Sequence, residues 1–352
     1  SDLDFGSLHV RGTLVENAKM WILDYHMDGL RVDSTVTIRK DKDDGYDWDG
    51  ADNPDGWSFL QYLNNELRPL KGSRTMMIAE DIASNSWITK NTNEGGAGFM
   101  AQWQPSPINN VVTQWDDNYR DMYEVAHAVG HTIGVNYGLH EIVKYHSSHD
   151  NVDRRNNHWR LPNRIGDPAQ WYSRKRSKLA QAIILTAPGT PMIFMGDEFY
   201  ATGQWDDDPD HALDWAQLEA NRDYWEYNRA LIRLKRTRPA MHTNNLEVPV
   251  IDNDMKIIAY KRWNDQGDVI VFVYNFRAVE QTRSIPFPED GVWREIINSD
   301  SAFYGGDNVG NGGSVTVSGG LANVRLGSYS MIAFSMRQDS YPPGVVSTPN
   351  PA

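Results

Sequence analysis

The sequence predicts an α/β fold of parallel βα units that is followed by an all-β domain. Three observations predict this fold class. Short apolar strands alternate with helical stretches up to about residue 242, several strands end in polar residues, and the helical period disappears near Thr243. Alternating strands and helices are typical of a parallel sheet, and in a (β/α)8 barrel the carboxyl ends of the strands carry the active site.

The α/β part contains helices and strands of ordinary length. Apolar residues at helical spacing predict a helix over residues 8–27, and a short alternating run bounded by glycine predicts a strand over residues 28–33. A loop rich in Gly and Asp, residues 41–56, separates them from the next helix. The other expected helices cover residues 57–67, 174–185 and 225–236, and the other expected strands cover residues 75–79, 98–103, 142–146 and 192–195.

The second part has the pattern of antiparallel strands. Short alternating runs are separated by clusters of Gly, Asn and Asp, which are typical of β connections. We expect an all-β sandwich over residues 243–338, after an α/β part over residues 1–242, and a Pro-rich linker over residues 339–352. The clearest strands of the sandwich are residues 256–263, 269–276, 292–297, 314–317 and 330–334.

Composition excludes several kinds of function. The chain has 34 basic and 47 acidic residues, a formal net charge of −13, which disfavours a nucleic-acid partner. It has no cysteine, so disulfides, thiol catalysis and cysteine-ligated zinc are excluded. No run approaches the roughly 18 apolar residues that a membrane helix needs, and we expect no membrane partner. The 13 Trp and 16 Tyr suit stacking on sugar rings, although composition alone favours ordinary packing.

Three carboxylates stand at expected strand ends. Arg31 and Asp33 lie two residues apart on one strand, so their side chains share a face, and the arginine keeps the carboxylate charged and oriented. Glu80 and Asp150, which follows His149, are expected to end two further strands. Taken singly, each acid suits a surface carboxylate or a salt bridge. Together they suit glycoside hydrolysis, in which one carboxylate attacks the sugar and another protonates the leaving oxygen.

Five segments resemble the α-amylase superfamily of glycoside hydrolases, of the α-amylase and glycogen-branching-enzyme type. Their order and spacing also fit that family, and the resemblance covers about residues 8–336. The segments are Asp28 to Ser34, Met77 to Asp81, Tyr145 to Asn151, Ala187 to Phe199, and Leu213 to Trp215.

The resemblance implies a role for each matching residue. It makes Asp33 the nucleophile and Glu80 the general acid and base, while Asp150, helped by His149, grips sugar hydroxyls and stabilises the transition state. Arg31 orients Asp33. Two softer assignments, Gln102 and Trp103, line the donor side of the cleft. Retention of configuration further predicts carboxyl groups about 5–5.5 Å apart.

One family segment has no counterpart in this sequence. The family's third barrel strand carries an Asp and an Asn-His pair that bind sugar, and nothing similar occurs here. If Asp33 ends the fourth strand, the chain contains about strands 4 to 8 of the barrel, a partial TIM barrel. We therefore expect an N-terminal barrel segment as a partner, either in a separate chain or in a longer form of the protein.

The resemblance leaves the reaction open. The first hypothesis is a retaining hydrolase that cuts the α-1,4 bonds of starch or glycogen. The alternative is a 1,4-α-glucan branching enzyme, which passes the same covalent intermediate to a glucan 6-hydroxyl. A trehalose-releasing hydrolase, another transglycosylase of the superfamily and a non-catalytic carbohydrate-binding fragment are more remote. The linker predicts a secreted protein, whereas a branching enzyme would be cytoplasmic.

No cofactor is expected for the chemistry. A structural calcium ion is left open at the acidic residues 206–208 with Asp210 and at the loop of residues 41–56, because calcium prefers oxygen ligands. A solvated acidic loop is the favoured interpretation of both segments. His127 and His131 are four apart on an expected helix, but no acidic third ligand follows them, so we expect no metal there.

Overall fold

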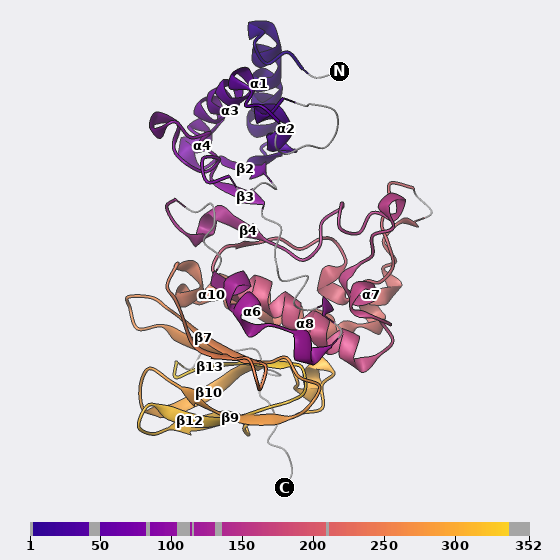
Figure 1. Ribbon diagram of the computed structural model, residues 1–352, viewed down its shortest axis with the longest axis vertical. Helices are drawn as coiled ribbons and strands as arrows, with labels where there is room; N and C mark the ends of the chain where they lie inside the picture. Colours follow the sequence, from indigo (N-terminus) through magenta and orange to yellow (C-terminus); the bar gives the residue numbers. More distant parts are fainter. Residues whose placement is uncertain are drawn as a thin grey trace. The chain divides into compact units, whose positions relative to one another are not determined.

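The computed structural model describes residues 3–41, 50–81, 85–103, 113–114, 116–130, 136–208 and 211–337. The chain divides into two compact units, residues 1–105 with 132–144 and residues 106–131 with 145–352 (Figure 1). His131, Asp210, residues 42–49 of the acidic loop and the Pro-rich segment 339–352 lie outside the described residues. The expectations about those residues stay predictions.

The first unit is built on parallel strands that alternate with helices. β1 pairs with β2, β2 with β3, and β3 with β4, each time in parallel. The register sets Val32 opposite Ala79, and Glu80 opposite Trp103, so the carboxyl ends of these strands share one edge. The bounds are α1 Leu8–Leu23, β1 Gly29–Val32, α2 Thr35–Arg39, α3 Pro54–Leu67, α4 Leu70–Ser73, β2 Met76–Glu80, β3 Ala101–Trp103 and β4 Ile142–Lys144.

Local sequence signals begin the helices, and one core holds them on the strands. Asn53 caps α3, since its side chain accepts a hydrogen bond from the amide of Gly56 at 2.8 Å, and a proline occupies the first helical position. Apolar residues of α1, α3 and β2 form a single buried cluster, which positions the strand ends. Its members include Val15, Ala18, Phe59, Leu60, Leu63, Met77 and Ala79.

The second unit combines helices with antiparallel sheets. One six-stranded sheet has the order β11-β10-β13-β8-β7-β6, and a second sheet pairs β12 with β9. The helices are α6 Met122–Gly130, α7 Leu161–Ile165, α8 Trp171–Thr186, α9 Ala216–Ala220 and α10 Arg222–Thr237. The strands are β5 Thr190–Pro191, β6 Leu246–Asp252, β7 Ile257–Trp263, β8 Val269–Asn275, β9 Gln281–Pro286, β10 Gly291–Asn298, β11 Ser314–Val317, β12 Leu321–Leu326 and β13 Ser330–Ser335.

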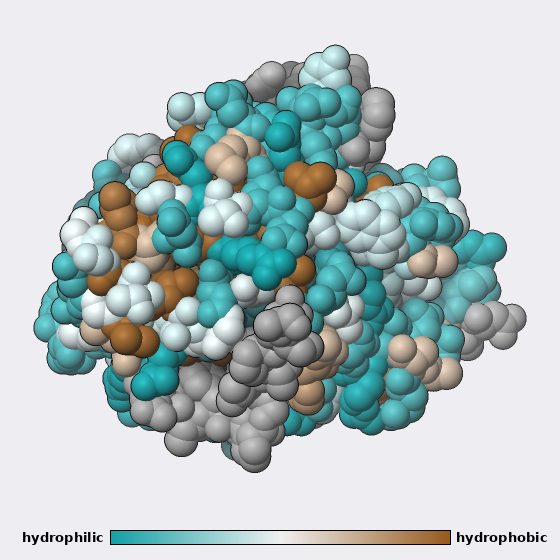
Figure 2. Space-filling model, turned by 90° about the horizontal axis from the view of Figure 1, so that it is seen from below, coloured by the Kyte–Doolittle hydropathy of each residue, from teal (hydrophilic) through white to brown (hydrophobic). Residues whose placement is uncertain are grey.

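The central strands of the six-stranded sheet are buried on both faces. Tyr260 and Phe272 belong to the core that the sheet shares with α6, α8 and α10, whereas Ala259 and Val271 face the core shared with the two-stranded sheet. This alternation follows from the two-residue period of a strand. On the molecular surface that Figure 2 shows, hydrophobic residues gather on one side of the view, with hydrophilic residues between them.

Most expected elements are present, and two expectations are wrong. Residues 192–195 do not form a strand, because the strand of that region is Thr190–Pro191. Asp150 does not end a strand, since β4 ends at Lys144 and Asp150 lies in a turn further along. The strands β6, β9 and β12 were not expected individually. The boundary predicted after residue 242 falls between α10 and β6, and the domain division itself stays a prediction.

Candidate active site

Arg31 joins two of the expected catalytic carboxylates in the first unit. Its Nη1 lies 2.7 Å from Asp33 Oδ1, and its Nη2 lies 2.5 Å from Glu80 Oε2. The guanidinium also stacks on the ring of Trp103, with 4.1 Å between Cζ and the ring centroid. One planar cation therefore holds both carboxylates at the shared edge of β1 and β2, as a guanidinium fork can.

The two carboxylates differ in exposure. The side chain of Asp33 is 75% exposed, whereas that of Glu80 is 13% exposed. Burial raises the pKa of Glu80, and the neighbouring Asp33 raises it further, while the Ser34 amide and Arg31 oppose the shift. An acid with a raised pKa keeps its proton nearer neutral pH, as a general acid must.

The turn after β1 fixes Glu80 from a second side. Ser34 has φ 41° and ψ 55°, a left-handed conformation that is unusual outside glycine, and its amide donates to Glu80 Oε2 at 3.0 Å. Thr35 Oγ1 donates to the Glu80 carbonyl at 3.0 Å and to Asp81 Oδ2 at 3.1 Å. Sequence reasoning missed these two positioning residues, although Ser34 directly follows the expected nucleophile.

Gln102 and Trp103 occupy the end of β3. Trp103 is 9% exposed and is covered by Arg31, so it supports that guanidinium. Gln102 is fully buried, and its Nε2 donates to the Asn85 carbonyl at 3.3 Å. Their assignment to the donor side of a sugar cleft stays a prediction.

His149 and Asp150 lie together in the second unit. His149 Nε2 is 3.3 Å from Asp150 Oδ1, and both side chains are exposed, at 40% and 63%. The His149 ring meets Trp205 edge to face, and His158 Nδ1 bonds the Asp150 carbonyl at 2.6 Å. The pair is therefore accessible and held by neighbours of its own unit. Asp33, Glu80 and Arg31 are brought together in the first unit.

A buried network lies in the segment that precedes Asp150. His146 Nε2 bonds Gln181 at 2.7 Å, its Nδ1 bonds Ser147 Oγ at 2.8 Å, and the Asp197 carboxylate lies 3.6 Å away. Burial lowers the pKa of His146 and raises the pKa of Asp197. Arg164 also donates to the His146 carbonyl through Nη2 at 2.6 Å, so side chains of the second unit hold this buried segment.

Two of the acidic residues considered for calcium pair with basic or histidine side chains. Asp206 pairs with His211 at 2.9 Å and with Arg154 at 3.6 Å, and Asp207 pairs with Arg155. Across the parts of the chain that the structure describes, no three acidic or histidine side chains meet as they would around a metal ion. A structural calcium stays a prediction. None of the described helices is both long and apolar enough to cross a membrane.

Comparisons with known proteins match this architecture over nearly its whole length. The model of the α-amylase catalytic domain matches residues 1–264, and that of the α-amylase C-terminal all-β domain matches residues 250–337. The chain belongs to the α-amylase family. The expected fold class, a partial (β/α)8 barrel followed by an all-β domain, is thereby confirmed.

Two similar curated proteins are both branching enzymes by name. The 1,4-α-glucan branching enzyme GlgB of Dechloromonas aromatica is 31% identical over 339 residues, which cover 90% of this chain and 52% of that protein. The GlgB of Mesorhizobium japonicum is 31% identical over 332 residues, 89% of this chain and 43% of that protein. The chain thus spans about half the length of the curated relatives that it matches.

Solved structures with the same fold include two α-amylases. The Anoxybacillus α-amylase has a TM-score of 0.70 at 15% identity. The match covers 96% of this chain and 66% of that protein. The H. orenii α-amylase has a TM-score of 0.67 at 18% identity, and the match covers 95% of this chain and 65% of that protein. At these identities the likeness concerns the fold alone.

Proposed function

We propose that this chain supplies the catalytic carboxylates of a 1,4-α-glucan branching enzyme. The observation that carries the proposal is the bridge from Arg31 to Asp33 and Glu80 in a chain of the α-amylase family. The hydrolase hypothesis finds support at the level of the family. The relatives named as branching enzymes favour transfer to a glucan hydroxyl over transfer to water.

The first step breaks an α-1,4 bond. A carboxylate oxygen of Asp33 attacks the anomeric carbon and forms a glycosyl ester, while Glu80 gives its proton to the departing 4-oxygen. The exposed Asp33 suits the nucleophile and the buried Glu80, with its raised pKa, suits the acid. Arg31 contacts both side chains and so orients them for the two roles.

The second step reverses the roles. Glu80, now ionised, takes the proton of an incoming 6-hydroxyl, whose oxygen attacks the anomeric carbon and releases Asp33. The product is an α-1,6 branch, and both carboxyl groups return to their starting states. The guanidinium remains between them throughout, so it stabilises whichever carboxylate is charged. Asp150 and His149 are proposed to hold sugar hydroxyls.

The test uses the full-length protein on long unbranched amylose. Two quantities are followed: new reducing ends, and new short chains released after debranching. We expect branch points to accumulate while reducing ends stay nearly flat. Reducing ends that rise steeply without branches would instead establish the hydrolase, with water as the acceptor.

Two variants connect this activity to the site. Asp33→Asn should abolish branching, because an amide is too weak a nucleophile to form the ester. Asp28→Asn is the matched control, since Asp28 immediately precedes β1, at the opposite end of this strand from Asp33, and pairs with Lys71 at 2.8 Å. Full activity in Asp33→Asn would remove the basis of the proposal.

A further inference from the structure

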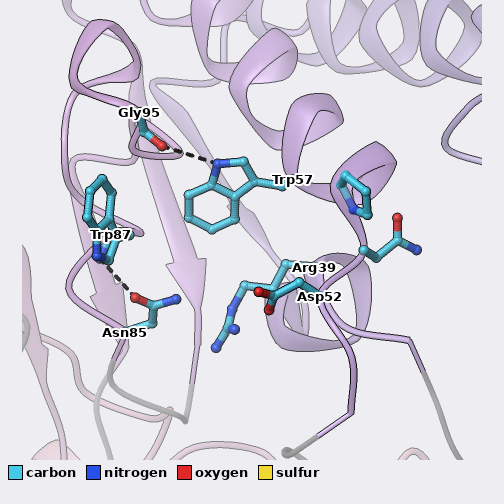
Figure 3. Close-up of a pocket in the computed structure, with 8 residues that line it drawn as sticks. Arg39, Asp52, Trp57, Asn85, Trp87 and Gly95 are labelled. Carbon is cyan, nitrogen blue, oxygen red and sulfur yellow. Dashed lines mark hydrogen bonds between the residues drawn. The ribbon is translucent and has the colours of Figure 1, made fainter.

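A pocket in the first unit is distinct from the proposed catalytic carboxylates. It has a volume of about 450 Å³, within the range of small-molecule sites. None of Arg31, Asp33 and Glu80 lines it. The residues that do come from the end of α2, the start of α3 and the segment that follows β2: Arg39, Asp52, Asn53, Pro54, Trp57, Asn85, Trp87 and Gly95 (Figure 3).

Two tryptophans form its aromatic walls. Trp57 projects from α3 and donates its Nε1 hydrogen to the Gly95 carbonyl at 3.2 Å, which fixes the plane of the ring (Figure 3). Trp87 is 46% exposed and carries Lys90 Nζ 4.0 Å from its ring centroid. The Trp57 ring is therefore held in place before a ligand arrives, which lowers the entropy cost of binding.

The polar groups of the pocket are oriented by contacts of their own. Asn85 Oδ1 accepts a hydrogen bond from the backbone amide of Trp87 at 3.0 Å. This contact directs the side-chain nitrogen of Asn85 toward the centre of the pocket (Figure 3). Arg39 is 6% exposed and binds the buried Asp81 through Nε and Nη2, at 2.8 and 3.0 Å. Asp52 is the exposed member, and it pairs with Lys40 at 2.9 Å.

The charges select for a neutral ligand. Asp81 compensates Arg39, and Lys40 compensates Asp52, so these two described ion pairs offer no net charge to an ion. Lys90 beside Trp87 further disfavours a cation between the rings, the arrangement in which aromatic cages hold ammonium groups. A neutral molecule with one apolar face and several hydroxyls fits rings and amides of this kind. A hexose unit has these properties.

The pocket is connected to the catalytic acid through α2 and the end of β2. Asp81, which anchors Arg39, directly follows Glu80 in the chain. Thr35, in the first turn of α2, binds the Glu80 carbonyl and the Asp81 carboxylate together. A glucan chain held at the pocket is thus held by the same short segments that position Glu80.

We propose that the pocket between Trp57 and Trp87 binds a glucose unit of an α-glucan chain, as an accessory site separate from the reacting bond. The identity of the sugar rests on the proposed function, whereas the existence of the site rests on the geometry. Such a site raises the affinity for long chains by adding contacts away from the scissile bond.

The first test places the ligand directly. Full-length protein carrying Glu80→Gln, which prevents turnover, is labelled with 5-fluorotryptophan and titrated with maltoheptaose. Trp57→Phe and Trp87→Phe assign the two fluorine resonances. We expect both resonances to shift. Unmoved resonances at saturating maltoheptaose, or shifts produced by choline and not by maltoheptaose, would overturn the site.

The second test is kinetic. Trp87→Ala should raise the KM for amylose about tenfold, and any change in kcat should be smaller. A tenfold loss of affinity corresponds to about 1.4 kcal/mol of binding free energy. Trp215→Ala is the control, because Trp215 is 64% exposed in the second unit and packs on Phe199. An unchanged KM in Trp87→Ala would contradict the proposal. Absence of turnover in the wild type, with shifted resonances, would reject the branching function and leave the site standing.

Discussion

Replacing Arg31 separates the electrostatic role of this residue from its structural one. Its guanidinium contacts Asp33 at 2.7 Å and Glu80 at 2.5 Å, and Glu80 is largely buried. An opposite charge at this range lowers the pKa of a carboxyl, so its removal should raise the pKa of Glu80. Arg31→Met provides the removal, and Arg31→Lys keeps the charge without the fork.

The sign of the effect follows from the role of Glu80. The acid must be protonated to donate, so a higher pKa extends the active range toward alkaline pH. We expect the alkaline limb of the pH–rate profile of Arg31→Met to move to higher pH. The maximal rate should fall about 100-fold, the scale of a misplaced reacting group. Arg31→Lys should lose rate with a smaller displacement of the limb.

The assay is the initial rate of branch formation on amylose between pH 5 and 10. Arg74→Met is the matched control, because Arg74 is exposed just before β2. An alkaline limb that stays in place in Arg31→Met would refute the assignment of Glu80 as the acid under the control of Arg31.

Two further predictions concern stability. Arg39→Met should cost about 3–5 kcal/mol in urea unfolding, because it leaves the buried Asp81 without its bidentate partner; a loss below 1 kcal/mol would contradict this. Burial in the second unit lowers the pKa of Lys178 to about 7, and its ammonium donates to the Ser299 and Tyr304 carbonyls. The unfolded chain then binds the extra proton between pH 7 and 10, so wild-type stability should rise there by up to about 1.4 kcal/mol per pH unit relative to Lys178→Met. Parallel pH–stability curves for the two proteins would show that the pKa of Lys178 is not lowered in the folded protein.

The sequence predicted those elements in which apolar residues recur at the regular spacing of a helix or a strand. β7 and β8 were expected from short runs that the structure buries almost completely, and α3 was expected over residues 57–67, within its observed bounds. β9 was missed because only Ile285 of its residues is fully buried, so polar side chains hide the alternation. The apolar run 192–195 looked like a strand, although the paired backbone lies at Thr190–Pro191.

At the candidate site, too, the local sequence pattern predicted single positions but not the contacts between segments. Asp33 and Glu80 stand where strand periodicity placed them, and Arg31 on the face of Asp33 followed from the two-residue period. The ion pair from Arg31 to Glu80 and the amide of Ser34 on Glu80 depend on the parallel register of β1 with β2. Such contacts arise only when the strands meet, so no local pattern contains them. The pocket at Trp57 and Trp87 likewise joins segments from two different parts of the chain.

The central claim is that Asp33 forms a covalent ester and Glu80 acts as the acid and base. It is tested most directly by trapping that ester. An α-maltosyl fluoride needs no acid to leave, so Glu80→Gln should react with it at Asp33 and then turn over slowly, since no base activates the acceptor. Mass spectrometry of the digested protein should find a maltosyl group on the peptide that contains Asp33. An adduct on another carboxylate, or none while Asp33→Asn retains activity, would contradict the account.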